Sequence, residues 1–213
     1  MTQRRKFWMR WRVRFGYLVA VIYIVLVTPT PHSIVIGGMV AAFGLFIRGA
    51  AAGHLRKGRE LATTGPYAHV RNPLYLGSAL LGAGFVVAGN SWWVAGVVIA
   101  YFVIFYPAVM HNEEEDLRAS FGQALEEYAE RVPLFFPKLI GKGYEPPTGE
   151  GPARSFSWEQ YRQNREYRAL LGMVAGLVGV AAHVAANEMR MLSELVLYCS
   201  RYTACMTRWN FGR

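Results

Sequence analysis

Two apolar runs, LYLGSALLGAGFVVA (residues 74–88) and WWVAGVVIAYFVIFYPAVM (residues 92–110), are separated only by Gly-Asn-Ser and contain no charged residue. A helix needs about 20 residues to cross the hydrocarbon core of a bilayer. A very short connection between two helices folds them back as an antiparallel pair. The two runs therefore predict a membrane-spanning hairpin, with a kink at Pro107 in its second helix.

Three more apolar runs, at residues 15–27, 33–47 and 169–186, bring the number of expected spans to about five. The first two are short, but arginines can snorkel from a helix end, and the second run can continue through residues 49–53 if Arg48 faces protein. The sequence thus predicts an all-α, polytopic transmembrane helix bundle. We expect residues 1–213 to form a single integral-membrane domain, with a functional core at residues 48–137 and an unassigned tail at 188–213.

The composition supports a membrane location. Hydrophobic residues make up 53% of the chain and charged residues 17%, whereas soluble domains carry about 25% charged residues. The net charge of +9 comes largely from residues beside the apolar runs, which is typical of membrane orientation and argues against a nucleic-acid partner. The first run is preceded by a cluster of basic residues: Arg4, Arg5, Lys6, Arg10, Arg12 and Arg14.

The distribution of basic residues also predicts the orientation. Residues 28–32 and 89–91 contain no lysine or arginine, whereas residues 48–71 contain five. Positively charged connections remain on the cytoplasmic side of a membrane. We therefore expect a protein of the bacterial inner membrane, with its N-terminus, residues 48–71 and the acids that follow the fourth run all facing the cytoplasm.

An amphipathic stretch follows the fourth run. Its apolar residues recur at helical spacing, at Leu117, Phe121, Leu125, Tyr128 and Val132. We expect an interfacial helix that lies over the cytoplasmic site. A loop at 141–152 and a polar helix at 155–168 are expected to lead into the fifth run, where Gly172 and Gly176 form a small-residue pair that favours close helix packing.

The C-terminal tail has no consistent interpretation. Five spans from a cytoplasmic N-terminus place the tail outside, but its arginines, at 190, 201, 208 and 213, argue against that side. Whether the fifth run crosses therefore stays open. The two cysteines, Cys199 and Cys205, are too few for a disulfide framework or a metal site. No metal is expected, and the oligomeric state is not predicted.

Residues 65–77 combine a tight turn with the start of a helix. Gly65-Pro66 favours a turn, and Asn72-Pro73 is typical of a helix N-terminus. A helix N-terminus presents free N–H groups and positive potential, to which Arg71 adds a charge, so an anionic group would be stabilised there. The acids at 113–115, after the returning helix, could accept hydrogen bonds from hydroxyl or ammonium groups. An alternative is that these charges are only solvated helix ends.

These motifs, in this order, resemble the isoprenylcysteine carboxyl methyltransferases and the related phospholipid N-methyltransferases. The resemblance covers about residues 48–137. It rests on Gly65-Pro66-Tyr67, on Arg71-Asn72-Pro73-Leu74-Tyr75-Leu76-Gly77, on Glu113-Glu114 with Leu117, on Phe121-Gly122, and on Tyr128 before Val132-Pro133. Asn72 stands where many members have histidine, and His111 stands where bacterial members often have arginine, so the acceptor is not defined by the resemblance.

The resemblance implies S-adenosylmethionine as cofactor, bound at the cytoplasmic membrane face, and a lipid-like acceptor that enters from the bilayer. The residues it implies for the cofactor site are Gly65, Pro66, Tyr67, Arg71, Asn72, Pro73, Tyr75, Gly77, Glu113 and Glu114. The residues it implies for catalysis are Arg48, His54, His111 and Glu114, with Arg48 facing the acceptor.

The chemistry of the acceptor stays open at this point. A carboxylate needs only orientation, for which Arg48 or His111 would serve, whereas an amine must lose a proton, for which Glu114, His54 or His111 would serve. A membrane reductase of sterol-like lipids is a second hypothesis, although no Gly-x-Gly-x-x-Gly motif is present. A non-enzymatic transporter or scaffold is a third, which the clustering of ionisable residues at one face disfavours.

Overall fold

The computed structural model describes residues 3–138, 143–145 and 155–210, and these residues form helices and no strands. The helices, in chain order, are α1 (Gln3–Leu26), α2 (Pro31–His54), the short 3-10 helix η1 (Gly65–Ala68), α3 (Pro73–Gly89), α4 (Trp92–Phe121), α5 (Gln123–Arg131), α6 (Trp158–Gln163) and α7 (Tyr167–Asn210). The prediction of an all-α fold is confirmed for the described residues.

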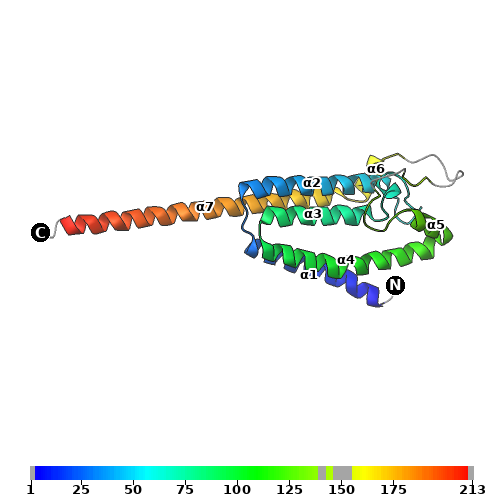
Figure 1. The fold of residues 1–213 in the computed structure, drawn as a ribbon, viewed down its shortest axis with the longest axis horizontal. Coiled ribbons are helices and arrows are strands. Elements are labelled where there is room, and N and C mark those ends of the chain that lie inside the picture. The colour runs from blue at the N-terminus through cyan, green and yellow to red at the C-terminus, as the bar shows by residue number, and fades with distance from the viewer. Residues whose placement is uncertain (1–2, 139–142, 146–154, 211–213) are drawn as a thin grey trace.

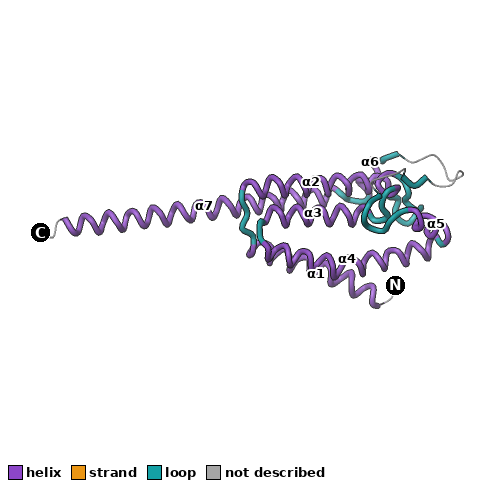
Figure 2. The backbone as a smooth tube through the Cα atoms, in the orientation of Figure 1, coloured by secondary structure: helices purple, strands orange, loops and turns teal. Residues whose placement is uncertain are grey.

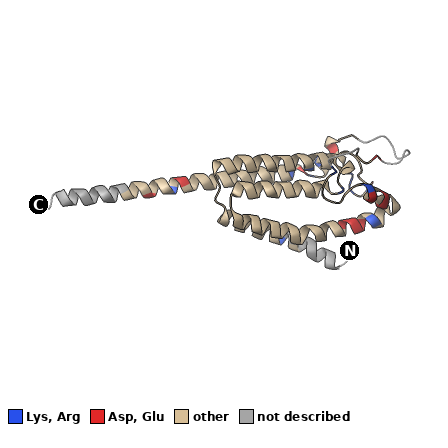
Figure 3. Ribbon diagram, in the orientation of Figure 1, with Lys and Arg blue, Asp and Glu red and all other residues tan. Residues whose placement is uncertain are grey.

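The helices form an elongated bundle with its loops concentrated at one end (Figure 1, Figure 2). Helices α2, α3 and the first half of α7 lie side by side, and α1 lies along α4. At one end, two short connections join α1 to α2 and α3 to α4. The longer loops, η1, α5 and α6 gather at the opposite end, which we call the loop end of the bundle. Charged residues gather at that same end, and a further group lies on the part of α7 that extends beyond the bundle (Figure 3).

Three helical segments are long and apolar enough to cross a membrane: Pro31–His54, Trp92–Phe121 and Tyr167–Tyr198. The other two predicted runs are also helical, but Arg14–Leu26 and Pro73–Gly89 are shorter. The 17 residues of α3 rise about 26 Å at 1.5 Å per residue, slightly less than a hydrocarbon core of about 30 Å. The structure therefore describes an integral membrane protein, while the number of five crossings stays a prediction.

Glycines bring α2 and α3 into backbone contact. A Cβ atom added at Gly84 would lie 2.5 Å from the backbone nitrogen of Ala41, and one added at Gly44 would lie 2.6 Å from the carbonyl oxygen of Gly77. Such distances leave no room for a side chain, so the two helices approach as closely as their backbones allow. This contact fixes α3, and the loop before it, relative to the end of α2.

Helix α4 continues beyond the apolar run and past Pro107 as far as Phe121, so the acids at 113–116 are part of it. The predicted amphipathic helix is divided at Gly122, whose φ of 49° favours glycine. Helix α5 follows and packs Leu125 and Tyr128 into a small buried cluster together with Val132. The amphipathic pattern was correctly placed at the loop end, but it belongs to two helices.

Helix α7 has 44 residues and is about 66 Å long. Its first half packs on α2 and α3, and its second half extends beyond the end opposite the loops (Figure 1). Gly176 faces Phe85, with the nearest ring atom 2.6 Å from an added Cβ, whereas no atom lies within 4 Å of one at Gly172. The predicted tail is therefore continuous with the fifth helix as far as Asn210, and residues 211–213 lie outside the described residues. The predicted loop at 141–152 is described only at residues 143–145, which are not helical.

Candidate functional site

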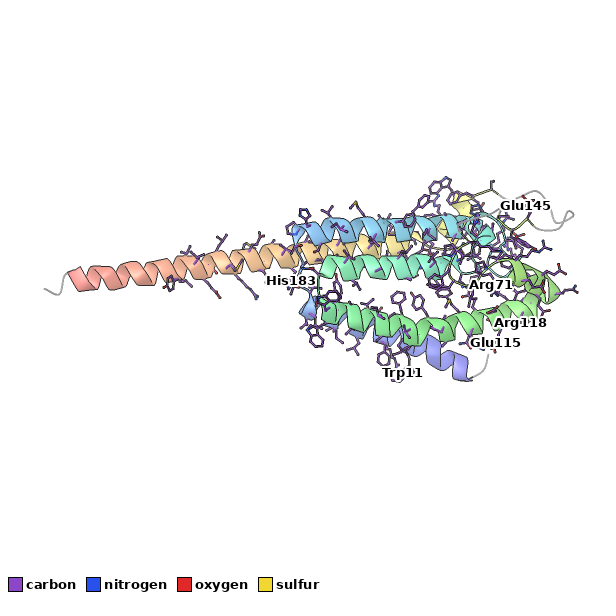
Figure 4. All side chains as sticks on the ribbon, in the orientation of Figure 1. Trp11, Arg71, Glu115, Arg118, Glu145 and His183 are labelled. Carbon is purple, nitrogen blue, oxygen red and sulfur yellow. The ribbon has the colours of Figure 1, made fainter. Side chains whose placement is uncertain are left out.

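Arg71 and Glu114 form an ion pair that joins the loop before α3 to the C-terminal part of α4. The Arg71 backbone N–H donates to the carbonyl oxygen of Pro133 at 2.9 Å, and the Lys138 N–H donates to that of His69 at 3.1 Å. The segment that follows α5 therefore holds the loop in place from the other side. Figure 4 shows Arg71 at the loop end of the bundle, near the first turn of α3.

Two more polar contacts organise the same region. The Tyr75 hydroxyl donates to Glu113 Oε2 at 2.7 Å, which gives a second link between α3 and α4. Asn72 Nδ2 donates to the carbonyl oxygen of Leu134 at 3.2 Å. The turn-and-arginine element before α3 and the acids of α4 are thus in direct contact at one end of the bundle, as expected from their order in the sequence.

Buried tyrosines hold the turn at η1. The Tyr128 hydroxyl donates to the carbonyl oxygen of Tyr67 at 2.6 Å. Both side chains are buried, and burial raises the pKa of each phenol above its ordinary value. The two phenols therefore stay protonated at physiological pH, and Tyr128 remains a hydrogen-bond donor.

A cavity of about 780 Å³ lies between α3, α4, α5 and the loops. Its volume is in the range of cofactor and drug-sized ligand sites. Its lining combines charged and aromatic side chains, among them Arg48, Lys57, Glu60, Tyr67, Arg71, Asn72, Tyr75, Ser78, Tyr101, Tyr106, Asn112, Glu113, Glu114, Asp116, Phe121 and Tyr128. Seven of the ten predicted cofactor-site residues are in this lining: Tyr67, Arg71, Asn72, Pro73, Tyr75, Glu113 and Glu114.

The cavity has a polar part and an apolar part. The Arg71–Glu114 ion pair and Glu113 lie in the polar part, and Leu74, Tyr101, Tyr106 and Val109 line the apolar part between α3 and α4. An added Cβ at Gly82 would lie 2.8 Å from the ring of Phe102, so α3 and α4 touch there. Phe102 also packs on Tyr106, with 4.2 Å between ring centroids. The Phe102–Gly82 contact therefore closes the space between α3 and α4 on the side of Tyr106 that is farther from the loop end.

Other predicted residues lie outside this lining. His54 contacts the carbonyl oxygen of Ala50 through Nδ1 at 2.9 Å, and its ring lies against Gly65, where an added Cβ would be 2.6 Å away. His111 is exposed and lies 3.3 Å from Glu115 Oε1. Gly77 packs against the Arg48 side chain and α2. His54 thus packs against the turn at Gly65 and Pro66. Neither His54 nor His111 is part of the cavity lining.

Arg48 has a partner that the sequence reasoning missed. Its Nε and Nη2 donate to the two carboxylate oxygens of Glu166, at 3.0 and 2.9 Å. Nη1 donates to Ser78 Oγ and to the carbonyl oxygen of Leu74, the latter at 3.2 Å. Glu166 is only 9% exposed. The available signal was an acid three residues before the fifth apolar run, inside the stretch 155–168 that was expected to be one polar helix. The structure divides this stretch into α6 and the beginning of α7, and Glu166 lies between the two helices.

The segment that carries Glu166 is fixed to the end of α2. Asn164 Nδ2 donates to the carbonyl oxygens of Ala52 and Leu55, both at 2.9 Å. The Ser157 N–H donates to the carbonyl oxygen of Gly53 at 3.0 Å, and the Phe156 ring covers that glycine closely. These contacts position residues 155–166 beside the cavity even though they are far from α2 in the sequence.

The residues of the cavity fit the cofactor that the resemblance implies. Arg71 Nε is buried and has no hydrogen-bond partner among the described residues, which leaves a donor for an anionic group. Glu113 and Glu114, which also line the cavity, provide acceptors. A ligand that carries both a carboxylate and cationic groups matches such a lining. The described residues contain no group of three or more His, Cys, Asp or Glu that could hold a metal ion.

Together, the apolar helices and the cavity define an integral membrane protein with a polar, aromatic-lined cavity at the loop end of its helix bundle. The model of the phospholipid methyltransferase family matches residues 11–124, more than half of the chain. The chain therefore belongs to this family of membrane methyltransferases. No solved structure matches the chain.

Two curated relatives are similar to a shorter segment. The nickel-cobalt-cadmium resistance protein NccN of Alcaligenes xylosoxydans xylosoxydans is 38% identical over 84 residues. The cobalt-zinc-cadmium resistance protein CzcN of Cupriavidus metallidurans is 39% identical over 84 residues. Each alignment covers 39% of this chain, and it covers 39% of NccN and 38% of CzcN. The chain thus matches about two fifths of the length of either relative.

Proposed function

We propose that this protein transfers a methyl group from S-adenosylmethionine to a lipid-like acceptor at the cytoplasmic face of the membrane. The observation that carries the proposal is the cavity, in which an ionic cluster at Arg71, Glu113 and Glu114 is continuous with an apolar part between α3 and α4. A polar cofactor and an amphiphilic acceptor would be able to meet in one space. The family match supports the reaction class.

Within the polar part, Arg71 and the N-terminus of α3 would hold the cofactor carboxylate, because both present positive potential. Glu113 and Glu114 would accept hydrogen bonds from its ammonium or hydroxyl groups. When bound, S-adenosylmethionine supplies a methyl group on a positively charged sulfur, which takes up the electron pair of the carbon–sulfur bond as the acceptor bonds to the methyl carbon. The side chains then act by orientation and by exclusion of water.

The position of the residues narrows the choice of proton acceptor. Of Glu114, His54 and His111, only Glu114 lines the cavity. An amine acceptor that must lose a proton would therefore find a carboxylate and no imidazole. We propose Glu114 for this role, with His54 as a residue that positions the turn at Gly65.

We further propose that the chain crosses the bacterial inner membrane five times and that the loop end faces the cytoplasm. The basic residues at the N-terminus and in the loops after α2 support this orientation, as do the connections at the other end, which contain no lysine or arginine.

Calorimetry on the purified protein in detergent micelles tests the proposal directly. We expect saturable binding of S-adenosylmethionine and none of a nicotinamide nucleotide. Binding of the nucleotide alone would favour a lipid reductase, and binding of neither would favour a scaffold. A second measurement incubates membranes that contain the protein with a methyl-labelled donor and extracts the lipid. Label in the lipid fraction, absent from membranes without the protein, identifies the acceptor.

A role in metal resistance is a second candidate function, favoured by the names of the two relatives. If methyl transfer underlies such a role, cells that express the Arg71→Ala variant should be as sensitive to cobalt, nickel and cadmium as cells without the protein. Equal tolerance with the wild type and with Arg71→Ala would separate resistance from the transfer site.

A further inference from the structure

The Arg48–Glu166 pair lies beside the apolar part of the cavity. Arg48 lines the cavity together with Leu74 and Ser78, two residues of α3 that it also contacts. Glu166 is paired with it from just before α7, outside the segment that matches the family, and does not line the cavity. The side chains of Arg48 and Glu166 are 20% and 10% exposed, so the attraction between their charges is only weakly screened by water.

The hydrogen bonds of Arg48 are nearly all used within the protein. A guanidinium has five N–H donors, and four of those of Arg48 point to Glu166, Ser78 and Leu74. One Nη2 hydrogen remains. Arginine recognises a carboxylate best through two parallel hydrogen bonds, and the face of Arg48 that makes such a pair is already occupied by Glu166.

The charges around the cavity also argue against an anionic group beside Arg48. The lining contains the cations Arg48, Lys57 and Arg71 and the four carboxylates Glu60, Glu113, Glu114 and Asp116. Glu166 adds a fifth carboxylate directly behind Arg48. Arg71 is paired with Glu114 in the same way, and Glu60 with Arg56. An anionic acceptor group beside Arg48 would therefore meet a cation that Glu166 already neutralises, and little attraction would remain to offset the cost of removing the anion from water.

We propose that Glu166 is a specificity-determining residue: by neutralising Arg48 it excludes acceptors whose reacting group is an anion, and it selects amphiphiles with an uncharged or basic group. This inference rests on the proposed function, and it decides between the carboxylate and amine acceptors that the sequence left open. Glu166 acts through Arg48 and does not itself line the cavity.

The experiment compares two short amphiphiles of equal chain length, octanoate and octylamine, by titration calorimetry at pH 8 in maltoside micelles, with empty micelles as baseline. The wild type should bind octylamine at least tenfold more tightly than octanoate. In Glu166→Gln the released guanidinium should bind octanoate at least tenfold more tightly than the wild type does. The matched control Glu159→Gln, on the exposed face of α6, should behave as the wild type.

The double variant Arg48→Gln/Glu166→Gln guards against loss of folding in the single variant. It keeps the pair uncharged and should continue to exclude octanoate. A wild type that prefers octanoate, or an octanoate affinity that is the same in the wild type and in folded Glu166→Gln, would overturn the proposal. Binding of S-adenosylmethionine is measured on the same samples, so its absence would count against the proposed function separately.

Methyl transfer gives an independent readout. If the acceptor group is uncharged or basic, mild alkali should release no labelled methanol from the lipid that wild-type membranes have methylated. A methyl ester would release the label as methanol under the same treatment, and this result would contradict the role of Glu166.

Discussion

Arg71 and Glu114 are 43 residues apart in the chain and form an ion pair in the lining of the cavity. The contact depends on the hairpin of α3 and α4, which returns the chain to the level at which it started. The Nε–H group of Arg71 has no hydrogen-bond partner among the described residues. Arg71 can therefore donate a hydrogen bond to a ligand while it stays paired with Glu114.

We predict that Arg71→Ala lowers the affinity for S-adenosylmethionine by ten- to a hundredfold. A hydrogen bond to a charged group contributes about 1.5–3 kcal/mol, and the variant also leaves Glu114 without its partner. Titration calorimetry in detergent measures the change. The matched control is Arg118→Ala, which removes an exposed arginine one helical turn beyond Glu114 on α4. An equal loss of affinity in both variants would contradict a specific role of Arg71.

We predict that Phe102→Ala shifts the preference of the protein toward acceptors with longer acyl or alkyl chains. Phe102 closes the α3–α4 cleft by packing on Gly82, and its loss would open the apolar part of the cavity. The distribution of labelled methyl over lipids of different chain length should shift toward longer chains. Val103→Ala, on the exposed side of the same turn, should leave the distribution unchanged, and so should Phe102→Ala if the acceptor does not occupy this cleft.

We predict that Tyr128→Phe lowers the free energy of unfolding by about 1 kcal/mol, because the carbonyl of Tyr67 loses its donor. The pKa of Tyr128 is raised by burial, so its contribution is complete below the ordinary tyrosine pKa of about 10. It is lost as the pH rises further, because the unfolded chain ionises first. Thermal unfolding in detergent between pH 8 and 11 should therefore show a weaker alkaline loss in Tyr128→Phe than in the wild type.

We predict that Gly84→Ala destabilises the bundle by about 1–3 kcal/mol, the usual cost of overpacking, because the new methyl group would lie 2.5 Å from the backbone of α2. Gly96→Ala is the matched control. No atom lies within 4 Å of an added Cβ there, so alanine should be neutral or stabilising. Thermal unfolding of both variants measures the difference, and equal stability would argue against the close α2–α3 contact.

Much of the architecture follows from local patterns. The apolar runs predicted the helices, because a continuous apolar stretch can satisfy its backbone in lipid only as a helix or a closed barrel. The basic connections and the alternation of the spans predicted that residues 65–77 and the acids at 113–115 lie at the same end. Arg71 and Glu114 lie together for that reason.

Contacts between distant parts of the chain could not be predicted in this way. Arg48 and Glu166 are 118 residues apart, and nothing in the pattern of either segment specifies the other. The closing contact between Phe102 and Gly82 depends on the rotation of α4 about its axis, which a uniformly apolar run does not encode. His54 was expected to act in catalysis, but its Nδ1 contacts the carbonyl oxygen of Ala50 and its ring lies against Gly65, so the side chain faces the turn and is not part of the cavity lining.

The length of α7 has a consequence for the two ends of the protein. Helix α1 begins near the loop end, and α7 leaves the bundle at the other end and continues as a helix to Asn210 (Figure 1). His183 already lies near the connections opposite the loops (Figure 4). If the loop end faces the cytoplasm, as we propose, alkaline phosphatase fused after residue 213 should fold in the periplasm and be active, whereas the same enzyme fused before residue 1 should stay in the reducing cytoplasm and be inactive.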